Sequence, residues 1–437
     1  MASPIREYVR GLGLGAWAVG GSVRDELLGI ERRDEDFVVP GLDHDSLRAE
    51  LERHGRVEEI VVHGELKGLR LHPHGPVLRR LAPAGIELAA APGGEEALAA
   101  DLRRRDFTVD AIARSLETGA LHDPLGGLAD LARRELRAVT PESLAADPLR
   151  ILRALRLVSQ HGFTPTGETL ALMRRDAPRL AAVAPERVGG GVAEDARGEL
   201  SLLLLGAEPR RALRLARDTG ALVAVVPELA AIVGVALDSP RQPLTLEEHV
   251  FAVVQGAADL GASLSVRLAA LLHDLGKPAA DASGEAHAEV GARIAAAVLE
   301  RLRYPVRVVR EVTAIVRAHS FRLDGVDERR ARRFLADHGR ELAFELVALK
   351  EADLRAKRVP DGEREALTRL RTLLERELDS PHRLADLAVD GDDLIALGLP
   401  QGPEVGRVLR LLLDEVVDEP GRNDREALLE RARRELP

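Results

Sequence analysis

Two carboxylates one residue apart, Asp34 and Asp36, follow a glycine pair in the stretch "GGSVRDELLGIERRDEDFVV" (residues 20–39). On a β-strand this spacing places both side chains on one face. Two hard oxygen ligands on one face suit Mg²⁺, which keeps several waters and accepts the phosphates of a substrate. Gly20 and Gly21 would let backbone amides approach a phosphate closely. The stretch therefore predicts a site for a metal-bound triphosphate.

The elements that would position these groups are a strand and a helix. "AWAVGG" (residues 16–21) is typical of a strand that ends at the glycines. "SVRDELLG" (residues 22–29) predicts a helix whose positive N-terminal end lies at the same place. A glycine-rich turn followed by the charged loop "ERRDED" would account for either half alone. The two halves in this order and spacing favour nucleotidyl transfer.

Histidines and aspartates form a second set in the later half of the chain. Its members, in order, are His249, His273, Asp274, His287, His319 and Asp353. An adjacent His-Asp pair at a helix end can reach one metal ion while other helices supply the remaining ligands. A single histidine is more often a hydrogen-bonded polar residue than a ligand. The order of the whole set, with "HDLGK" inside it, favours a metal site.

The composition indicates a globular protein with several domains. The chain has 437 residues, 45% hydrophobic and 31% charged, and this length suggests about two to four domains. Aromatic residues make up only 2%, so aromatic stacking platforms for bases are scarce. Of the 62 lysines and arginines four are lysines, at positions 67, 277, 350 and 357, which leaves 58 arginines. A bias this uniform is typical of genomic base composition, so an arginine is not by itself a functional signal.

Several functional classes are excluded by what the sequence lacks. There is no cysteine, which excludes disulfides, thiolate metal sites and cysteine nucleophiles. No segment has the apolar length of a signal peptide or a membrane span, so we expect a cytoplasmic protein with no membrane partner. The net charge of −10 argues against general coating of nucleic acid. A local basic groove is compatible with it, because only the contacted face must be positive.

The residue patterns divide the chain into an α+β part and a long helical part. Residues 1–139 mix short β-like runs with helical stretches, whereas residues 140–235 repeat apolar residues at helical spacing. A second all-helical domain is predicted at residues 236–357, and its first ten residues, 236–245, contain two prolines and form a plausible linker. A final helical region occupies residues 358–437.

The α+β part and the start of the helical part carry motifs of a known family. In order, these are "GGSVRDELLG" with "DED", "RRRDFTVDAIA" (103–113), "DPLGGLADL" (123–131), "DPLRILRALRL" (147–157) and "PERV" (185–188). They resemble the motifs of bacterial tRNA nucleotidyltransferases and the related poly(A) polymerases, class II members of the polymerase-beta-like superfamily. The resemblance implies an α+β nucleotidyltransferase head, an all-α neck and body with an HD-type helical domain, and a helical tail. It also implies addition of nucleotides to the tRNA 3′ end without a nucleic-acid template.

The resemblance assigns the catalytic role to the two carboxylates. Asp34 and Asp36 would hold two Mg²⁺ ions. One ion would lower the pKa of the primer 3′-hydroxyl, and the other would hold the triphosphate and the departing pyrophosphate.

The resemblance also assigns nucleotide-binding residues in the head. These are Gly20, Gly21 and Arg24 at the triphosphate, Arg105 at a phosphate and Asp106 at the ribose. For the last two, a structural ion pair between them is the alternative.

Base selection would fall to the segment that begins at Asp147. Asp147 and Arg150 are three residues apart, and on a helix they would share a face. The carboxylate could accept a hydrogen bond from the cytosine amino group while the guanidinium donates to the ring acceptors. Arg153 and Arg156 continue this face and could serve the triphosphate. The alternative is a solvated amphipathic helix with arginines on its polar side.

The segment before the second motif is short, since only "PGGEEA" separates Ala91 from "LAADLRRRD". In this family a loop deletion here marks enzymes that add only the two C residues and leave the terminal A to a second enzyme. The resemblance therefore implies CC addition from CTP. Full CCA addition from CTP and ATP is the first alternative, and poly(A) polymerase the next. The implied partners are the tRNA 3′ end and acceptor stem, CTP or ATP, and a separate A-adding enzyme.

The second set resembles the HD phosphohydrolase domain found in some members of this family. The ligands of a divalent transition metal implied by that resemblance are His249, His273, Asp274 and Asp353, with His287 and His319 nearby. Lys277 stands where the domain often has the lysine of HDxGK. The alternative function from a different class is therefore an HD-type metal-dependent phosphohydrolase acting on nucleotides or RNA ends. A non-catalytic tRNA-binding role is the third hypothesis.

Overall fold

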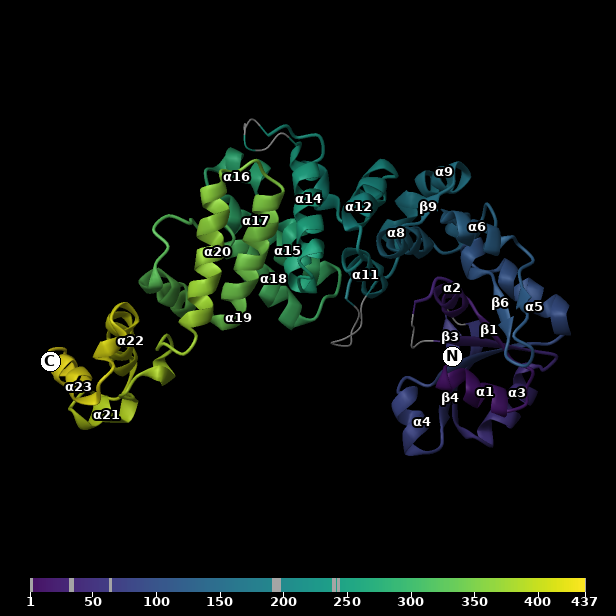
Figure 1. Ribbon diagram of the computed structural model, residues 1–437, viewed down its shortest axis with the longest axis horizontal. Helices are drawn as coiled ribbons and strands as arrows, with labels where there is room; N and C mark the ends of the chain where they lie inside the picture. The colour runs from purple at the N-terminus through teal and green to yellow at the C-terminus, as the bar shows by residue number, and fades with distance from the viewer. Residues whose placement is uncertain are drawn as a thin grey trace. The chain divides into compact units, whose positions relative to one another are not determined.

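The computed structural model describes residues 3–30, 35–62, 65–190, 198–237, 241 and 244–436. The chain forms two units, which are traced in Figure 1. The first comprises Met1–Val183 and Leu215–Val225, and the second comprises Ala184–Arg214 and Val226–Pro437. Helix α12 (Pro209–Asp218) therefore contributes residues to both units.

A seven-stranded sheet is the centre of the first unit. Its strands lie in the order β3-β4-β5-β2-β1-β6-β7, and all neighbours are antiparallel except β2 and β5, which are parallel. The bounds are β1 Trp17–Val19, β2 Asp36–Pro40, β3 Gly55–Val62, β4 Glu65–Pro73, β5 Ile86–Ala91, β6 Ala113–Ser115 and β7 Leu121–His122. In this order β1, which ends just before the glycine pair, lies next to β2, which begins at Asp36.

Apolar cores cover both faces of this sheet. Phe37 and Val39 of β2 belong to one core and Val38 to the other, as alternating side chains require. Because both faces are buried there, residues 37–39 of β2 form a continuous apolar run that follows the exposed Asp36. The helices of this part are α1 Pro4–Gly11, α2 Gly21–Leu27, α3 His44–Glu52, α4 Pro76–Leu81, α5 Gly94–Arg103 and α6 Gly127–Arg133, with a 3-10 turn η1 at Thr108–Asp110.

Helices complete the first unit beyond the sheet. Two short strands, β8 (Glu135–Leu136) and β9 (Thr164–Pro165), pair in parallel, and α7 and α8 lie between them in the chain. The helical elements are α7 Ser143–Ala146, α8 Leu149–His161, α9 Gly167–Asp176, η2 Ala177–Ala182 and α13 Ala221–Val225. Most of α8 is buried, including Ile151 and Leu155, so its apolar spacing reflects core packing.

Among its described residues the second unit has helices and connecting turns but no β-strand. Its elements are α10 Pro185–Val188, α11 Glu199–Leu204, η3 Pro227–Ala231, α14 Leu246–Asp259, α15 Leu264–Leu272, α16 Lys277–Ser283, α17 His287–Arg301, α18 Val306–Ala318, α19 Glu328–Arg355 and α20 Asp361–Arg376. The last segments are η4 Leu384–Asp386, α21 Gly391–Ala396, α22 Pro403–Asp418, η5 Pro420–Arg422 and α23 Arg425–Arg433. These C-terminal helices have an apolar core of their own, which includes Leu394, Leu412 and Leu428.

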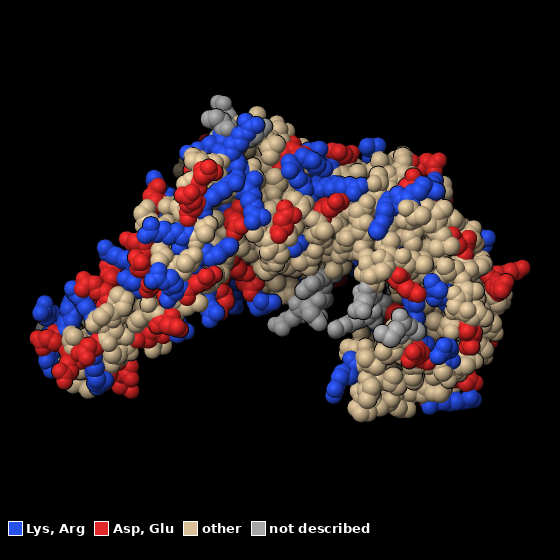
Figure 2. Space-filling view, in the orientation of Figure 1, with Lys and Arg blue, Asp and Glu red and all other residues tan. Residues whose placement is uncertain are grey.

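The expected α+β head with a helical body is confirmed, whereas the domain boundaries at residues 139, 235 and 357 stay a prediction. None of the helices in the described part of the chain combines the length and the apolar character that a membrane-spanning helix needs. Figure 2 shows basic and acidic side chains interspersed over the visible face. Arg210 and Arg214 illustrate this mixing, because both contact Glu248, at 3.5 and 2.6 Å.

Candidate active site and metal centre

Strand pairing places Asp36 directly beside the glycine pair. Val19, at the end of β1, pairs with Asp36, at the start of β2, and Gly20 follows. Gly20 has φ 74°, and a Cβ on it would lie 3.0 Å from Nη1 of Arg105 and 3.9 Å from Oδ2 of Asp36. The exposed carboxylate of Asp36, the guanidinium of Arg105 and the glycine backbone at Gly20 together suit a Mg²⁺-bound phosphate. Asp34 lies outside the described residues, so the carboxylate pair stays a prediction.

Arg24 is buried between two carboxylates, with 1% of its surface exposed. Its Nε donates to Oδ1 of Asp25 at 2.8 Å, and its Nη1 donates to Asp110 on η1. Burial lowers the pKa of Arg24, but the charges of Asp110 and Asp25 outweigh this effect and leave the pKa raised. The guanidinium therefore joins α2 to η1, and its predicted contact with the triphosphate stays a prediction. Asp110 supplies the second carboxylate.

Arg105 and Asp106 each have a different partner. Nη2 of Arg105 lies 2.9 Å from Oδ2 of Asp101, one helical turn earlier. Nε of Arg153, on α8, lies 2.9 Å from Oδ2 of the buried Asp106. The second motif is thus tied to the segment expected to select the base. Asp101 was missed, although its spacing of four residues from Arg105 was a signal that the sequence carried.

The expectation that Asp147 and Arg150 share a helical face is wrong. Helix α8 begins at Leu149, and Asp147 has φ −143° and ψ 98°, an extended conformation. The physical reason is Pro148, because the residue before a proline is disfavoured in the helical region. Oδ1 of Asp147 instead accepts a hydrogen bond from the Leu149 amide at 3.2 Å.

The arginines of α8 differ in how they are held. Arg150 donates to the carbonyl oxygens of Ser143 at 3.1 Å and of Arg104 at 2.9 Å. Arg153 contacts Asp106, and Arg156 is 7% exposed within the unit. Two of the three arginines therefore hold α8 against the second motif, and the role of all three at a nucleotide stays a prediction.

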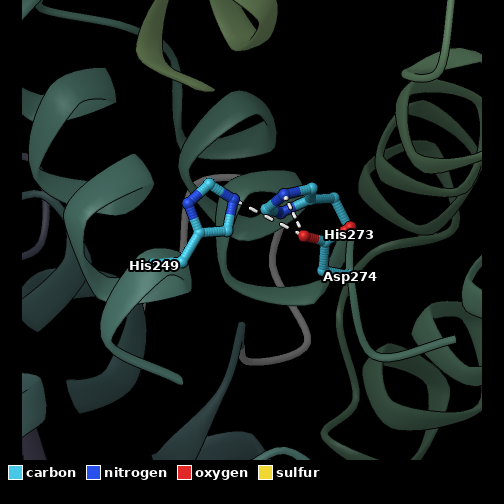
Figure 3. Close-up of side chains that lie close together, drawn as sticks. All are labelled: His249, His273 and Asp274. Carbon is cyan, nitrogen blue, oxygen red and sulfur yellow. Dashed lines mark ion pairs between the residues drawn. The ribbon is translucent and has the colours of Figure 1, made fainter. Parts of the chain in front are cut away.

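The first ligand group of the second unit forms because α14 and α19 approach closely. A Cβ on Gly256 of α14 would lie 3.1 Å from Cα of Ala352 on α19, so a larger residue would push the helices apart. Nε2 of His249 on α14 lies 3.2 Å from Oδ1 of Asp353 on α19 and 3.5 Å from Oδ2 of Asp274. Figure 3 shows His249 and His273 converging on the Asp274 carboxylate.

Two further histidines lie close to Asp274, and one of them contacts its other oxygen. Nε2 of His319 lies 3.8 Å from Oδ1 of Asp274 and 3.3 Å from Nε2 of His287. A Cβ on Gly276 would lie 2.1 Å from the carbonyl oxygen of His287, so only glycine lets this turn lie against the start of α17. The structure thus brings together all six members of the predicted His/Asp set, in two groups that share Asp274.

Two of the four histidines, His273 and His319, are oriented as metal ligands usually are. Nδ1 of His273 donates to the carbonyl of Ala270 at 2.9 Å, and Nδ1 of His319 donates to that of Val316 at 2.6 Å. Each Nε2 therefore carries the lone pair and faces the carboxylates. The buried Nε2 of His273 lies 3.2 Å from Oδ2 of Asp274. Imidazole nitrogens with carboxylate oxygens fit a divalent transition metal.

The charge states of two members of this centre, Asp353 and His319, favour metal binding. Burial raises the pKa of Asp353, but the hydrogen bond with His249 and the charge of Lys357 outweigh it and hold the pKa well below its usual value. Burial and the neighbouring His273 lower the pKa of His319 to about 4. Near neutral pH, Asp353 is therefore charged and His319 neutral, which are the ligand forms that a metal requires.

Added divalent transition metal should therefore stabilise the protein through this centre. At a metal concentration a hundred times the dissociation constant, the gain is about 2.7 kcal/mol. We expect Mn²⁺ to raise the melting temperature of the metal-free chain, and Asp274→Asn to remove most of that rise. Asp281→Asn is the matched control, because Asp281 lies on the neighbouring α16 and outside the ligand set. An equal rise in both variants would contradict the assignment.

Family models match three successive parts of the chain. The Poly A polymerase head domain matches residues 16–137, the probable RNA and SrmB-binding site of polymerase A matches residues 162–233, and the HD domain matches residues 246–357. The fold and the two sites thus define a nucleotidyltransferase with an attached HD domain.

Similar proteins narrow this class. A Multifunctional CCA protein of Azoarcus sp. (strain BH72) is 39% identical over 310 residues, 69% of this chain and 73% of the relative. An A-adding tRNA nucleotidyltransferase of Deinococcus radiodurans is 37% identical over 331 residues, 72% and 74% of the two chains. The Bacillus stearothermophilus CCA-adding enzyme in complex with CTP has a TM-score of 0.70 at 25% identity, with 99% of both chains covered. The chain belongs to the family of bacterial tRNA nucleotidyltransferases and poly(A) polymerases, and it is a tRNA nucleotidyltransferase.

Proposed function

We propose that the enzyme adds two C residues to the tRNA 3′ end from CTP by a two-metal mechanism. The observation that carries CC specificity is the connection between β5 and α5. Because β5 ends at Ala91 and α5 begins at Gly94, only Pro92 and Gly93 join them. A two-residue connection between regular elements leaves no loop that could move and reshape the nucleotide pocket for ATP.

The carboxylates of the first motif would perform the metal chemistry. Asp34 and Asp36 would hold two Mg²⁺ ions, which lower the pKa of the attacking 3′-hydroxyl and neutralise the triphosphate when bound. The closeness of Arg105 to Gly20 and Asp36 supports a contact between its guanidinium and a phosphate oxygen. Arg105 would then orient the phosphate, and Gly20 would keep the space open.

The segment around Asp147 would select cytosine. Arg150 is held by two carbonyl oxygens, and Asp147 sits one residue before Pro148 with a fixed backbone. This rigidity supports recognition by position, since neither group needs to reorganise on binding. Asp106 would meet the ribose while Arg153 keeps its carboxylate in place. Arg24, which is engaged with two carboxylates, would act mainly by fixing the helix that carries Gly21.

Full CCA addition is the second candidate for the head. The names of the relatives favour it, because similar chains are called Multifunctional CCA protein and A-adding tRNA nucleotidyltransferase. If the proposal of CC addition holds, the product needs a separate A-adding enzyme as a partner. If the second candidate holds, that partner is not required.

Three tRNA substrates separate these outcomes. They end at the discriminator base, after one C and after two C residues, and each is incubated with CTP, with ATP and with both, followed by sequencing of the 3′ ends. We expect C to be added to the first two, and A to none of them, even with both nucleotides present. Addition of A to the third substrate overturns CC specificity. Extension of unrelated RNA with ATP alone would instead indicate a poly(A) polymerase.

A metal-dependent phosphohydrolase activity is the candidate for the second unit. It is favoured by the grouping of six His and Asp side chains, in two groups that share Asp274, where a structural histidine would need only one or two hydrogen-bond partners. The metal held there would polarise a phosphoryl group and an attacking water. Hydrolysis would join the water oxygen to phosphorus and break the ester bond, with a proton passing to the departing alcohol. The two activities would be independent, because the carboxylates of the first motif are not part of this set.

A further inference from the structure

Lysine is distributed very unevenly in this chain. Only four of its 62 basic residues are lysines, and three of them, Lys277, Lys350 and Lys357, line one cavity of about 240 Å³. The same cavity is lined by His273, Asp274 and other members of the metal set. In a chain with 58 arginines, this placement indicates a site where an ammonium group is needed and a guanidinium is not. A lysine offers a compact point charge, whereas the planar fork of arginine would fill much of so small a space.

The three lysines differ in their partners. Nζ of Lys277 lies 2.7 Å from Oδ2 of Asp274, and Nζ of Lys357 lies 2.6 Å from Oδ2 of Asp353. Each of these two ammonium groups is therefore matched by one carboxylate of the metal set. They neutralise the ligands and leave no net charge between them.

Lys350 is the exception. Among the described residues its Nζ has no ion pair within 4.0 Å and no hydrogen bond, and it lies 5.2 Å from the centre of the Phe321 ring. A cation–π contact of this kind contributes only about 0.5–1 kcal/mol. Burial lowers the pKa of Lys350, which reflects the cost of keeping this ammonium from water. An anion in the cavity would remove that cost.

The charge of the cavity indicates which anion fits. Three ammonium groups and two carboxylates give the lining a formal charge of +1 when the histidines are neutral, and a divalent metal raises it to +3. A phosphoryl dianion balances such a site better than a singly charged diester. Phosphate oxygens also accept the several hydrogen bonds that an ammonium group can donate.

We propose that Lys350 binds the terminal phosphoryl group of a phosphomonoester in this cavity. This inference rests on the phosphohydrolase candidate for the second unit and is independent of nucleotide addition by the head. Lys350 selects the dianion, and Lys277 and Lys357 contribute once metal binding draws Asp274 and Asp353 towards the ion. Free inorganic phosphate shares the recognised chemistry and occupies the same place.

Calorimetry with inorganic phosphate tests the binding step separately from hydrolysis. The full chain is titrated after loading with Mn²⁺ and again without metal, and Lys350→Met and Lys350→Arg are compared with Arg355→Met. Arg355 is the matched control, because it lies on the same helix, is exposed and pairs with Glu351 outside the cavity. We expect Lys350→Met to weaken phosphate binding about tenfold or more. Lys350→Arg should not restore it, and Arg355→Met should change it less than twofold.

Three binding results would overturn the inference. These are phosphate affinity of Lys350→Met within twofold of the unchanged protein, an equal loss in Arg355→Met, and no phosphate binding by the unchanged protein. Metal content is measured on each variant, and loss of metal from Lys350→Met would also contradict a role in phosphate binding. If Lys350→Met does not fold, Lys350→Gln replaces it with the same expectation.

Hydrolysis of 4-nitrophenyl phosphate and of bis(4-nitrophenyl) phosphate supplies the second readout. We expect Lys350→Met to raise KM for the monoester about tenfold and to leave KM for the diester nearly unchanged. Equal changes for both would contradict selection of the dianion. If the unchanged protein hydrolyses neither compound, the phosphohydrolase candidate fails, whereas the phosphate-binding role of Lys350 is still decided by calorimetry.

Discussion

Asp36→Asn should lower the rate of nucleotide addition to tRNA at least about a thousandfold. The amide is a neutral and weaker ligand, and metal ions contribute several kcal/mol to a phosphoryl-transfer step of this kind. Single-turnover extension of tRNA with CTP measures the effect directly. The same loss is expected for Asp34→Asn, which removes the second predicted ligand.

The controls for this prediction separate chemistry from folding. Asp45→Asn is the matched variant, because Asp45 is an exposed aspartate on α3 of the same unit, and its rate should change less than twofold. Hydrolysis of phosphomonoesters by the second unit should be unaffected in all three variants. Raising the Mg²⁺ concentration should recover little of the lost rate. If Asp36→Asn retains more than a tenth of the rate, the two-metal assignment to this carboxylate is wrong.

Arg24→Met should destabilise the first unit by about 3–5 kcal/mol. Removing the guanidinium leaves Asp25 and Asp110 buried without their shared positive partner, and a broken buried ion pair typically costs this much. Trp17 is the chain's only tryptophan and lies on β1, the strand that directly precedes α2 in the chain. Its fluorescence during urea unfolding therefore reports this unit in the full chain.

Two further variants make the stability prediction specific. Asp110→Asn keeps a hydrogen-bond acceptor and removes one carboxylate, so it should cost less than Arg24→Met, about 1–2 kcal/mol. In the double variant the cost of Arg24→Met should shrink by at least about 1 kcal/mol, because only one of the two carboxylates that pair with Arg24 is still charged. Arg48→Met, at an exposed ion pair, should change stability by about 1 kcal/mol at most. A cost for Arg24→Met below that of Arg48→Met would contradict the buried network.

Much of the candidate site followed from residue type and order. The spacing of Asp34 and Asp36 and the glycine pair before them predicted a nucleotidyltransferase head, and the family comparison confirms that head. The His/Asp set predicted a metal centre, and all six side chains do converge. The head and the convergence of the His/Asp set could be predicted because chemistry constrains which residue types can act and the backbone period constrains their local spacing, whereas metal binding there stays a prediction.

Other features depended on contacts between distant residues. The prediction that Asp147 lies in a helix is wrong for a local reason. It did not take into account Pro148, which follows Asp147 in the sequence and disfavours the helical conformation there. The burial of Arg24 could not be predicted from the sequence. Its partner Asp110 is 86 residues away in the chain and comes close only because η1 packs against α2. The ion pair between Arg153 and Asp106 of the second motif could not be predicted for the same reason, because the two residues are far apart in the sequence.

The sequence by itself determined the class of enzyme, the residue types of the His/Asp set and the short connection before α5. Only the tertiary structure decided which charges neutralise one another and which are left over. It paired Lys277 and Lys357 with Asp274 and Asp353 and left Lys350 beside an aromatic ring. The physical reason is that a charge acquires its role from the groups within a few ångströms, and in this fold those groups come from different helices.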